Sequence, residues 1–330
     1  MTLIKSRDIK TVGIVGGGVI GSGWASRCLG AGLNVIATDP SPTAEALMRE
    51  NIENAWPAVE QLGTAPGASI DRLTFTSDLA QAVGDADFIQ ENVPEREDVK
   101  IAVFKDISAH CRSDVVIASS SSGLLPSRIQ SETTDPSRVV IGHPFSPVYA
   151  LPLVEITGGE KTSHDAVVAA GAFYKSIGMR PLHVRKEIDA YLSDRLQCAM
   201  WHEALHLIDE GIATVPEIDA AITGGPGLRW AVMGMCLAWH AAGGPGGMRH
   251  TMEQFGPTLE LPWTKLKPPK LTNELREAVI TGSEAEAGDR EFRDIERRRD
   301  ACIVGFLEVL DKNWYKPEDD GWPELATADA

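Results

Sequence analysis

A glycine fingerprint close to the N-terminus constrains the fold of this chain more than any other feature. An apolar run at residues 12–15 leads into Gly16-x-Gly18-x-x-Gly21, and a stretch that favours a helix follows to residue 31. In such a turn the first glycine permits the sharp bend, the second lets a pyrophosphate approach the backbone, and the third lets the helix pack closely on the strand. The unpaired N–H groups at the helix start attract phosphates. The pattern therefore predicts a strand, turn and helix that bind a dinucleotide.

The acid that follows the next apolar run indicates which dinucleotide is bound. Residues 35–37 form that run, and it ends at Asp39, which we expect to accept hydrogen bonds from a ribose diol. Its negative charge would repel a 2′-phosphate, and no basic residue lies between Asp39 and Arg49 to offset this repulsion. The sequence therefore predicts NAD rather than NADP. A tight turn without a ligand is the alternative for a lone glycine motif, and the flanking strands and acid argue against it.

The rest of the chain divides into two regions of different periodicity. Short apolar runs alternate with helix-favouring stretches from residue 11 to about residue 186, and the runs largely stop after Glu187. This alternation is typical of a mostly parallel sheet covered by helices on both faces. We expect an α/β, Rossmann-type doubly wound NAD-binding domain at residues 1–186 and an all-α substrate and dimerisation domain at residues 187–330. Further strands are expected at residues 73–76, 86–89, 115–118, 138–141, 153–156 and 182–184.

Three local patterns give sharper structural expectations. Ser41 and Pro42 can begin a helix as its N-cap and first helical residue. Residues 190–210 favour a helix with apolar side chains on two faces, which predicts burial from both sides. Residues 316–330 hold few large apolar side chains, and we expect them to form a loosely held tail.

Charge and cysteine usage exclude several classes of function. A formal net charge of −16 argues against a nucleic-acid or anionic-membrane partner, because both need a basic surface. The five cysteines are scattered without CxxC spacing, which argues against a zinc site, another metal site or a disulfide framework. We expect them to be buried apolar residues in a reducing cytoplasm. No targeting segment and no run of 18 apolar residues is visible.

A second group of polar residues follows the later strands of the expected sheet. A serine cluster occupies residues 119–122, His143 precedes a proline, and Glu155 ends a Leu-Val-Glu run. Open α/β sheets bind ligands beyond the carboxyl ends of their strands. An imidazole supported by a carboxylate suits proton removal from an alcohol, so His143 and Glu155 are a candidate base and its orienter, and Ser122 could bond the reacting oxygen. Spacing alone leaves open that His143 is a turn residue and Glu155 an exposed strand-edge charge.

The order of these motifs resembles that of the 3-hydroxyacyl-CoA dehydrogenase superfamily over nearly the whole chain. The family's GxGxMG, Ser-Asn-Thr-Ser-Ser, His-Phe-Phe-Asn-Pro and Leu-Val-Glu motifs match residues 16–21, 119–123, 143–147 and 153–155. The resemblance implies that His143 and Glu155 form a catalytic pair and that Ser122 is the catalytic serine. The cofactor-binding residues that it implies are Gly16, Gly18, Val19, Ile20, Gly21, Asp39, Glu95 and Ser120.

Departures from the family motifs bear on the substrate. The final motif, Gly-Phe-x-x-Asn-Arg-Leu, reads Ala-Tyr-Leu-Ser-Asp-Arg-Leu at residues 190–196, so Asp194 stands where acyl-CoA enzymes hold a catalytic asparagine. Asparagine can donate a hydrogen bond, whereas an ionised aspartate cannot. Residues 41–70, from which the family contacts the CoA nucleotide, hold one basic residue, Arg49, against four glutamates. A polyanion such as CoA is therefore not the expected substrate.

Motifs in the second half resemble the branch of this family that oxidises the 3-hydroxyl of L-carnitine to 3-dehydrocarnitine with NAD. They read Gly-Leu-Arg-Trp at 227–230, Gly-Met-Arg-His at 247–250, Gln-Phe-Gly-Pro at 254–257 and Leu-Pro-Trp-Thr at 261–264. A quaternary ammonium has no N–H and is best held by aromatic faces and a carboxylate. The substrate-binding residues that we expect are Ser122, Ser146, Tyr149, Asp194, Trp201 and Trp230. Core or dimer-interface packing is the alternative for the tryptophans, and the partner of the substrate carboxylate stays open among Arg195, Arg229 and Ser122.

Two alternative functions follow from the same motifs. One is a dehydrogenase of another small 3-hydroxy acid, of the L-gulonate type, or of a 3-hydroxyacyl-CoA. The other is an NAD-binding structural protein without activity, against which the intact set of Ser122, His143 and Glu155 argues. The resemblance also implies a homodimer formed through the helical domain.

Overall fold

The computed structural model describes residues 3–257, 261–265, 267, 270, 272–275, 277–278, 280–281, 289 and 291–313. The tail expected at residues 316–330 lies outside these described residues. The chain divides into two compact units. The first unit holds the chain up to Asp194 together with Glu296–Glu308, and the second unit holds Arg195–Ile295 and the end of the last described helix.

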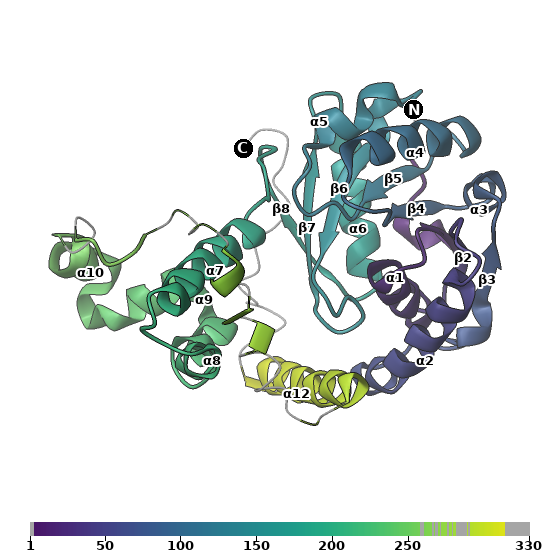
Figure 1. Cartoon of the computed structure of the whole chain (residues 1–330). Coiled ribbons are helices and arrows are strands. Elements are labelled where there is room, and N and C mark those ends of the chain that lie inside the picture. Colours follow the sequence, from purple (N-terminus) through teal and green to yellow (C-terminus); the bar gives the residue numbers. More distant parts are fainter. Residues whose placement is uncertain are drawn as a thin grey trace. The chain divides into compact units, whose positions relative to one another are not determined.

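A single eight-stranded sheet organises the first unit, with the strand order β3-β2-β1-β4-β5-β6-β7-β8 (Figure 1). All neighbouring pairs are parallel except β6 and β7, which are antiparallel. The predicted doubly wound, mostly parallel sheet is confirmed, and the antiparallel pair was not expected from the sequence. The strands are β1 (Thr11–Val15), β2 (Asn34–Thr38), β3 (Leu73–Thr76), β4 (Phe88–Glu91), β5 (Val116–Ser119), β6 (Val139–Pro144), β7 (Leu153–Gly158) and β8 (Arg180–His183).

Helices cover both faces of this sheet, because alternate strand residues point to opposite faces and both sets are apolar. In β5, for example, Val116 and Ala118 join the core cluster on one face, whereas Ile117 joins the cluster on the other face. The first cluster packs under α1 (Val19–Gly30), α2 (Ala44–Leu62) and α6 (His164–Ser176). The second packs under α3 (Leu79–Gly84), α4 (Glu97–His110) and α5 (Pro126–Ile129). Short 3-10 turns lie at Ser6–Asp8, Ile70–Arg72, Gln130–Glu132 and Pro136–Arg138.

The expected helix start at Ser41 and Pro42 is wrong, because α2 begins at Ala44. The backbone N–H of Ser41 donates to Asp39 Oδ1 at 2.8 Å, and the Ser41 hydroxyl accepts a hydrogen bond from the N–H of Thr43 at 3.4 Å. These bonds form a turn that joins β2 to the helix and delays its start. The turn also holds Asp39 at the end of β2.

The second unit is helical, as predicted. Its described helices are α7 (Ser193–Asp209), which begins at the end of the first unit, α8 (Val215–Thr223), α9 (Pro226–Ala242) and α10 (Gly247–Phe255), with a 3-10 turn at Gly244–Gly246. The last described helix, α12 (Phe292–Asn313), contributes Glu296–Glu308 to the first unit. None of these described helices combines the length and apolar character that a membrane crossing needs.

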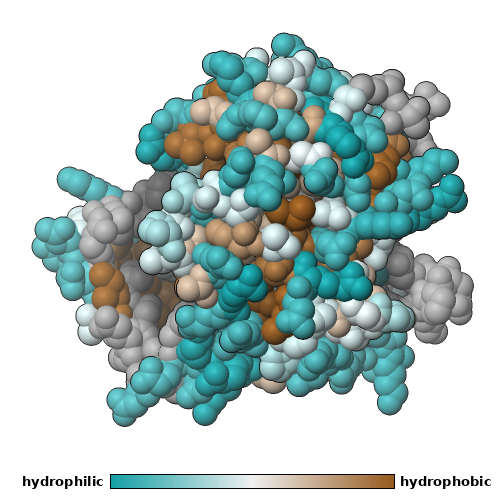
Figure 2. Space-filling model, turned by 90° about the vertical axis from the view of Figure 1, so that its right-hand side faces the viewer, coloured by the Kyte–Doolittle hydropathy of each residue, from teal (hydrophilic) through white to brown (hydrophobic). Residues whose placement is uncertain are grey.

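The predicted burial of α7 on both sides is wrong for the single chain. Leu205 is its buried residue, whereas Leu196 is 57% exposed and Trp201 is 52% exposed. The described elements of the second unit leave these two apolar side chains more than half exposed. The expectation of buried cysteines holds for Cys28 but is wrong for Cys198, Cys236 and Cys302, which lie on exposed helix positions. On the face shown in Figure 2, hydrophilic side chains surround smaller hydrophobic areas, consistent with the large net charge.

Candidate active site

The glycine turn between β1 and α1 has the geometry of a phosphate cradle. Gly16 has a φ of +101°, and a Cβ at Gly21 would lie 1.9 Å from the carbonyl oxygen of Gly16, so both positions exclude a side chain. At Gly18, in contrast, an added Cβ would meet no atom within 4 Å, and no side chain caps the helix that starts at Val19. An open approach to uncapped N–H groups at a helix start fits the pyrophosphate of a dinucleotide.

Asp39 lies beside this turn at the end of β2. Its Oδ2 accepts a hydrogen bond from the N–H of Gly17, and its Oδ1 accepts one from the N–H of Ser41, both at 2.8 Å. Each carboxylate oxygen keeps a second lone pair. The two backbone bonds fix the carboxylate next to the cradle, where its remaining lone pairs can accept from a ribose diol.

His143 and Glu155 face each other across the one antiparallel pair of strands in the described sheet. The register of β6 and β7 places them directly opposite, and His143 Nδ1 lies 3.0 Å from Glu155 Oε2. His143 is 3% exposed and Glu155 is 1% exposed. The contact fixes Nδ1 as the donor to the carboxylate, which leaves Nε2 as the nitrogen that can take a proton from a substrate.

The other oxygen of Glu155 is held by the start of α7. Oε1 accepts hydrogen bonds from the N–H of Leu192 at 3.2 Å, from the N–H of Ser193 at 3.0 Å and from the Ser193 hydroxyl at 3.1 Å. A buried carboxylate needs such donors, because its desolvation is costly when it has no partners. These bonds could not be predicted from the sequence, since Leu192 and Ser193 occupy variable positions of the family motif.

Asp194 lies on the opposite side of the histidine ring. Its Oδ2 is 3.5 Å from His143 Nε2. Burial raises the pKa of Asp194, and the nearby Glu155 and Glu95 carboxylates raise it further, whereas His143 lowers it. Two carboxylates thus flank the imidazole, one at each ring nitrogen. A cationic group beside Nε2 would be attracted by Asp194, whereas an anionic group would be repelled.

The serine loop, residues 119–124, is held by Glu95. Glu95 Oε1 accepts hydrogen bonds from the Ser121 hydroxyl at 2.5 Å, from the N–H of Ser122 at 3.0 Å and from the N–H of Gly123 at 3.1 Å. Ser122 itself is exposed. The arrangement presents the Ser122 side chain toward solvent on a backbone that Glu95 fixes.

The hydroxyl of Ser120 lies inside a buried network. It accepts hydrogen bonds from Trp24 Nε1 at 2.9 Å and Gln90 Nε2 at 2.8 Å, and it donates to Asn92 Oδ1 at 2.7 Å. A hydroxyl offers one donor and two acceptor positions, so these three bonds use its full capacity. The Ser120 side chain thus joins Trp24, Gln90 and Asn92. The cofactor contact expected of Ser120 stays a prediction.

A buried ion pair, which no sequence motif predicted, lies next to the serine loop. Lys100 Nζ is 2.8 Å from Glu91 Oε1, and the Ser119 hydroxyl donates to Glu91 Oε2 at 2.5 Å. Burial raises the pKa of Glu91, against the opposing effect of Lys100. Lys100 Nζ also lies 3.5 Å from Glu95 Oε2. The pair therefore supports the carboxylate of Glu95, which holds the loop. In the sequence, the acids at the end of β4 and just after it were the one hint of this ion pair.

The predicted aromatic substrate contacts fall in different units. Tyr149 belongs to the unit that contains His143, and its hydroxyl donates to Asp300 Oδ2 at 2.5 Å. Burial raises the pKa of the Tyr149 hydroxyl, with a further contribution from Asp300. Trp201 and Trp230 belong to the second unit. Ser146 precedes a cis proline. The substrate contacts predicted for Ser146, Tyr149 and the two tryptophans stay predictions.

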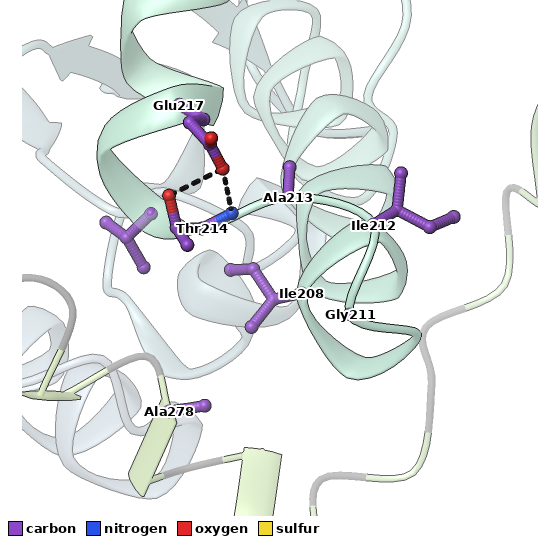
Figure 3. Close-up of a pocket in the computed structure, with 8 residues that line it drawn as sticks. Ile208, Gly211, Ile212, Ala213, Thr214, Glu217 and Ala278 are labelled. Carbon is purple, nitrogen blue, oxygen red and sulfur yellow. Dashed lines mark hydrogen bonds between the residues drawn. The ribbon is translucent and has the colours of Figure 1, made fainter.

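A separate pocket of about 300 Å³ lies in the second unit (Figure 3). It is lined mostly by apolar side chains at the junction of α7 and α8, and it includes no predicted site residue. Glu217 bonds the N–H and the hydroxyl of Thr214 there, which makes it the acid of a helix capping box. The pocket is lined by Ile208, Gly211, Ile212, Ala213, Thr214, Val215, Glu217 and Ala278.

Comparisons with known proteins identify the family of this chain. The model of the 3-hydroxyacyl-CoA dehydrogenase NAD binding domain matches residues 11–188, and the model of the C-terminal domain of the same enzymes matches residues 191–289. The L-carnitine dehydrogenase of Bacillus cereus (strain ZK / E33L) is 53% identical over 93% of this chain and 94% of its own length. The L-carnitine dehydrogenase of Pseudomonas aeruginosa is 53% identical over 92% of this chain and 94% of its own length.

Solved structures show the same architecture. An NAD+-dependent dismutase, 5-formyl-3-hydroxy-2-methylpyridine 4-carboxylic acid 5-dehydrogenase, superposes with a TM-score of 0.81 at 25% identity, over 92% of this chain and 99% of that chain. The (S)-3-hydroxybutyryl-CoA dehydrogenase PaaH1 from Ralstonia eutropha superposes with a TM-score of 0.62 at 27% identity, over 83% of this chain and 95% of that chain.

Proposed function

The chain belongs to the 3-hydroxyacyl-CoA dehydrogenase family, and we propose that it oxidises the 3-hydroxyl of L-carnitine with NAD. Family membership confirms the resemblance seen in the sequence motifs and makes the protein an NAD-dependent dehydrogenase. The observation that carries the choice of substrate is the position of Asp194, whose carboxylate lies 3.5 Å from His143 Nε2. The relatives named L-carnitine dehydrogenase support the same substrate.

The first unit contains residues that fit NAD. The turn from Gly16 to Gly21 would receive the pyrophosphate, and Asp39 would accept from the adenosine ribose. The charge of Asp39 disfavours a 2′-phosphate. When bound, NAD supplies the nicotinamide that accepts a hydride from the substrate carbon.

His143 is the proposed general base. Its Nε2 takes the proton of the 3-hydroxyl, while the Nδ1–H stays bonded to Glu155 Oε2. Glu155 then stabilises the imidazolium that forms. The hydroxyl of Ser122 is placed on the loop held by Glu95, and we assign it a hydrogen bond to the reacting oxygen.

Asp194 is the proposed partner of the trimethylammonium group. A quaternary ammonium cannot donate a hydrogen bond, so its recognition rests on charge and on aromatic faces. In L-carnitine the ammonium is attached to the carbon next to the one that bears the hydroxyl. If the hydroxyl of the substrate meets His143 Nε2, its ammonium group comes close to the Asp194 carboxylate, which lies beside the same nitrogen. Tyr149, which belongs to the same unit, would supply an aromatic face, and Trp201 and Trp230 stay predicted substrate contacts.

The test is the rate of NADH formation with four alcohols presented separately at mildly alkaline pH, where proton release favours oxidation. The alcohols are L-carnitine, D-carnitine, L-gulonate and 3-hydroxybutyryl-CoA. We expect activity to be confined to L-carnitine. Activity with gulonate or the CoA ester alone would overturn the substrate, and no activity with any of the four would overturn the proposed function.

We further propose that the protein is a homodimer formed through the helical unit and located in the cytoplasm. The exposed apolar faces of α7 support self-association, because large apolar patches on a folded unit mark interaction surfaces. The five free cysteines among the described residues are compatible with a reducing compartment. The net charge of −16 argues against a nucleic-acid or anionic-membrane partner.

A further inference from the structure

A buried tyrosine connects the two parts of the candidate site. Tyr191 is fully buried, and its hydroxyl donates a hydrogen bond to the carbonyl oxygen of Leu124 at 2.8 Å. Leu124 ends the serine loop, and its own N–H donates to the Ser121 hydroxyl at 3.0 Å. Burial raises the pKa of the Tyr191 hydroxyl, so it stays protonated and able to donate. One end of Tyr191 is thus fixed to the loop that presents Ser122.

The ring of Tyr191 lies against the proposed base. The centroids of the Tyr191 and His143 rings are 5.5 Å apart, with an angle of 51° between the planes. A tilted arrangement is a favoured packing of two rings, and His143 also contacts Phe145, with the ring centroids 4.6 Å apart. The same side chain therefore contacts the serine loop through its hydroxyl and the base through its ring.

The backbone around Tyr191 is in a conformation that L-residues rarely adopt. Ala190 has a φ of +59° and Tyr191 a φ of +45°, and these are the non-glycine residues with positive φ in the described chain. The two amides that follow, of Leu192 and Ser193, both donate to Glu155 Oε1. Strained backbone persists where surrounding contacts impose it, and it is concentrated at functional sites. Here the left-handed turn aims two N–H groups at the carboxylate that orients His143.

We propose that Tyr191 is a positioning residue, which sets the serine loop and the His143–Glu155 pair in one fixed relation. The inference rests on the proposed function, because it assigns Ser122 and His143 to the same reacting hydroxyl group. Tyr191 touches neither the glycine turn nor Asp39 in the described contacts. Its loss should therefore affect turnover and leave NAD binding unchanged.

Tyr191→Phe removes the bond to Leu124 and keeps the ring. Thr134→Val is the control for the loss of such a bond, because the hydroxyl of the exposed Thr134 also donates to a backbone carbonyl, that of Ser108 at 3.0 Å. Tyr191→Phe should lose a few degrees of melting temperature, and Thr134→Val should lose less, because Tyr191 is buried and Thr134 is exposed. We expect kcat to fall about tenfold in Tyr191→Phe, because small misplacements of reacting groups are costly, and to stay within about twofold in Thr134→Val. The KM for NAD should not change in either variant.

A second measurement does not depend on activity. The ¹⁵N resonances of the His143 ring, assigned with a His143→Gln variant, should shift in Tyr191→Phe and not in Thr134→Val. If wild-type enzyme oxidises an alcohol and both variants match each other in kcat and in the His143 resonances, the positioning role is overturned. If wild-type enzyme oxidises none of the four alcohols, the proposed function fails, and the His143 resonances alone decide whether Tyr191 positions the ring.

Discussion

The two units of the chain differ in how completely they bury their apolar side chains. In the first unit both faces of the sheet are covered, and the buried Glu155 beside His143 is bonded on both of its carboxylate oxygens. In the second unit large apolar side chains are exposed, among them Leu196 and Trp201. We infer that the first unit carries the proton chemistry within one chain, whereas the second carries a surface for assembly.

Removal of the proposed base should have the largest effect on activity, and it tests whether the first unit carries the proton chemistry. His143→Ala should lower kcat about a thousandfold, which is within the range attributed to general bases. NADH binding, measured by fluorescence titration, should persist because the glycine turn and Asp39 are separate from His143. His110→Ala, an exposed histidine on α4, is the control and should keep full activity. Near-normal turnover in His143→Ala would refute the assignment.

A charge on the exposed face of α7 tests whether the second unit carries the surface for assembly. Leu196→Glu should weaken self-association about a hundredfold, because an unpaired carboxylate would be desolvated in the interface. Sedimentation or light scattering at several concentrations measures this shift. Val168→Glu places the same charge on an exposed apolar position of α6 in the first unit and should leave the dimer intact. A wild-type protein that is monomeric at all concentrations would contradict the proposed homodimer.

Neutralisation of Asp194 separates substrate recognition from chemistry. Asp194→Asn should raise the KM for L-carnitine about tenfold, equivalent to ~1.4 kcal/mol, because the ammonium loses its counter-charge. The KM for NAD should stay the same. Asp209→Asn changes an exposed acid at the other end of α7 and is the matched control. An unchanged KM and kcat for L-carnitine would exclude Asp194 from the cation site.

The smallest expected effect concerns the choice between NAD and NADP. Asp39→Asn keeps the size of the side chain and removes its charge, so the preference for NAD should fall roughly fivefold. The ratio of kcat/KM for the two cofactors measures it. Asp106→Asn, an exposed acid on α4, controls for the change in net charge. An unaltered ratio would show that Asp39 does not discriminate at the 2′ position.

Much of the first unit could be predicted from sequence because local patterns encode it. The expected strand at residues 73–76 matches β3, and the expected strand at residues 153–156 lies within β7. The glycine spacing indicated the turn, since Gly16 and Gly21 leave no room for a side chain and Gly18 keeps the approach to the helix start open. The direction of β7 could not be predicted, because an apolar run has the same periodicity whichever way its strand runs.

Contacts between distant segments gave no comparable signal. The bonds from Ser193 to Glu155 and from Tyr191 to Leu124 join residues far apart in the chain, and neither pair has a diagnostic spacing. The exposure of Trp201 was also mispredicted, because amphipathic periodicity identifies an apolar face but not whether the same chain covers it. The positive φ of Ala190 stands where the family motif has glycine, and that substitution was the available hint.

The antiparallel pairing of β6 and β7 has a consequence for how enzymes of this design diversify. The distance between His143 and Glu155 is set by the register of two strands and not by the segment that joins them. That segment, residues 145–152, carries Ser146 and Tyr149. Because Ser146 and Tyr149 are proposed substrate contacts, we expect mutations there to alter which alcohol is accepted while the proposed His143–Glu155 pair keeps its geometry. We therefore expect substrate preference to vary in this fold without any change in the placement of the base.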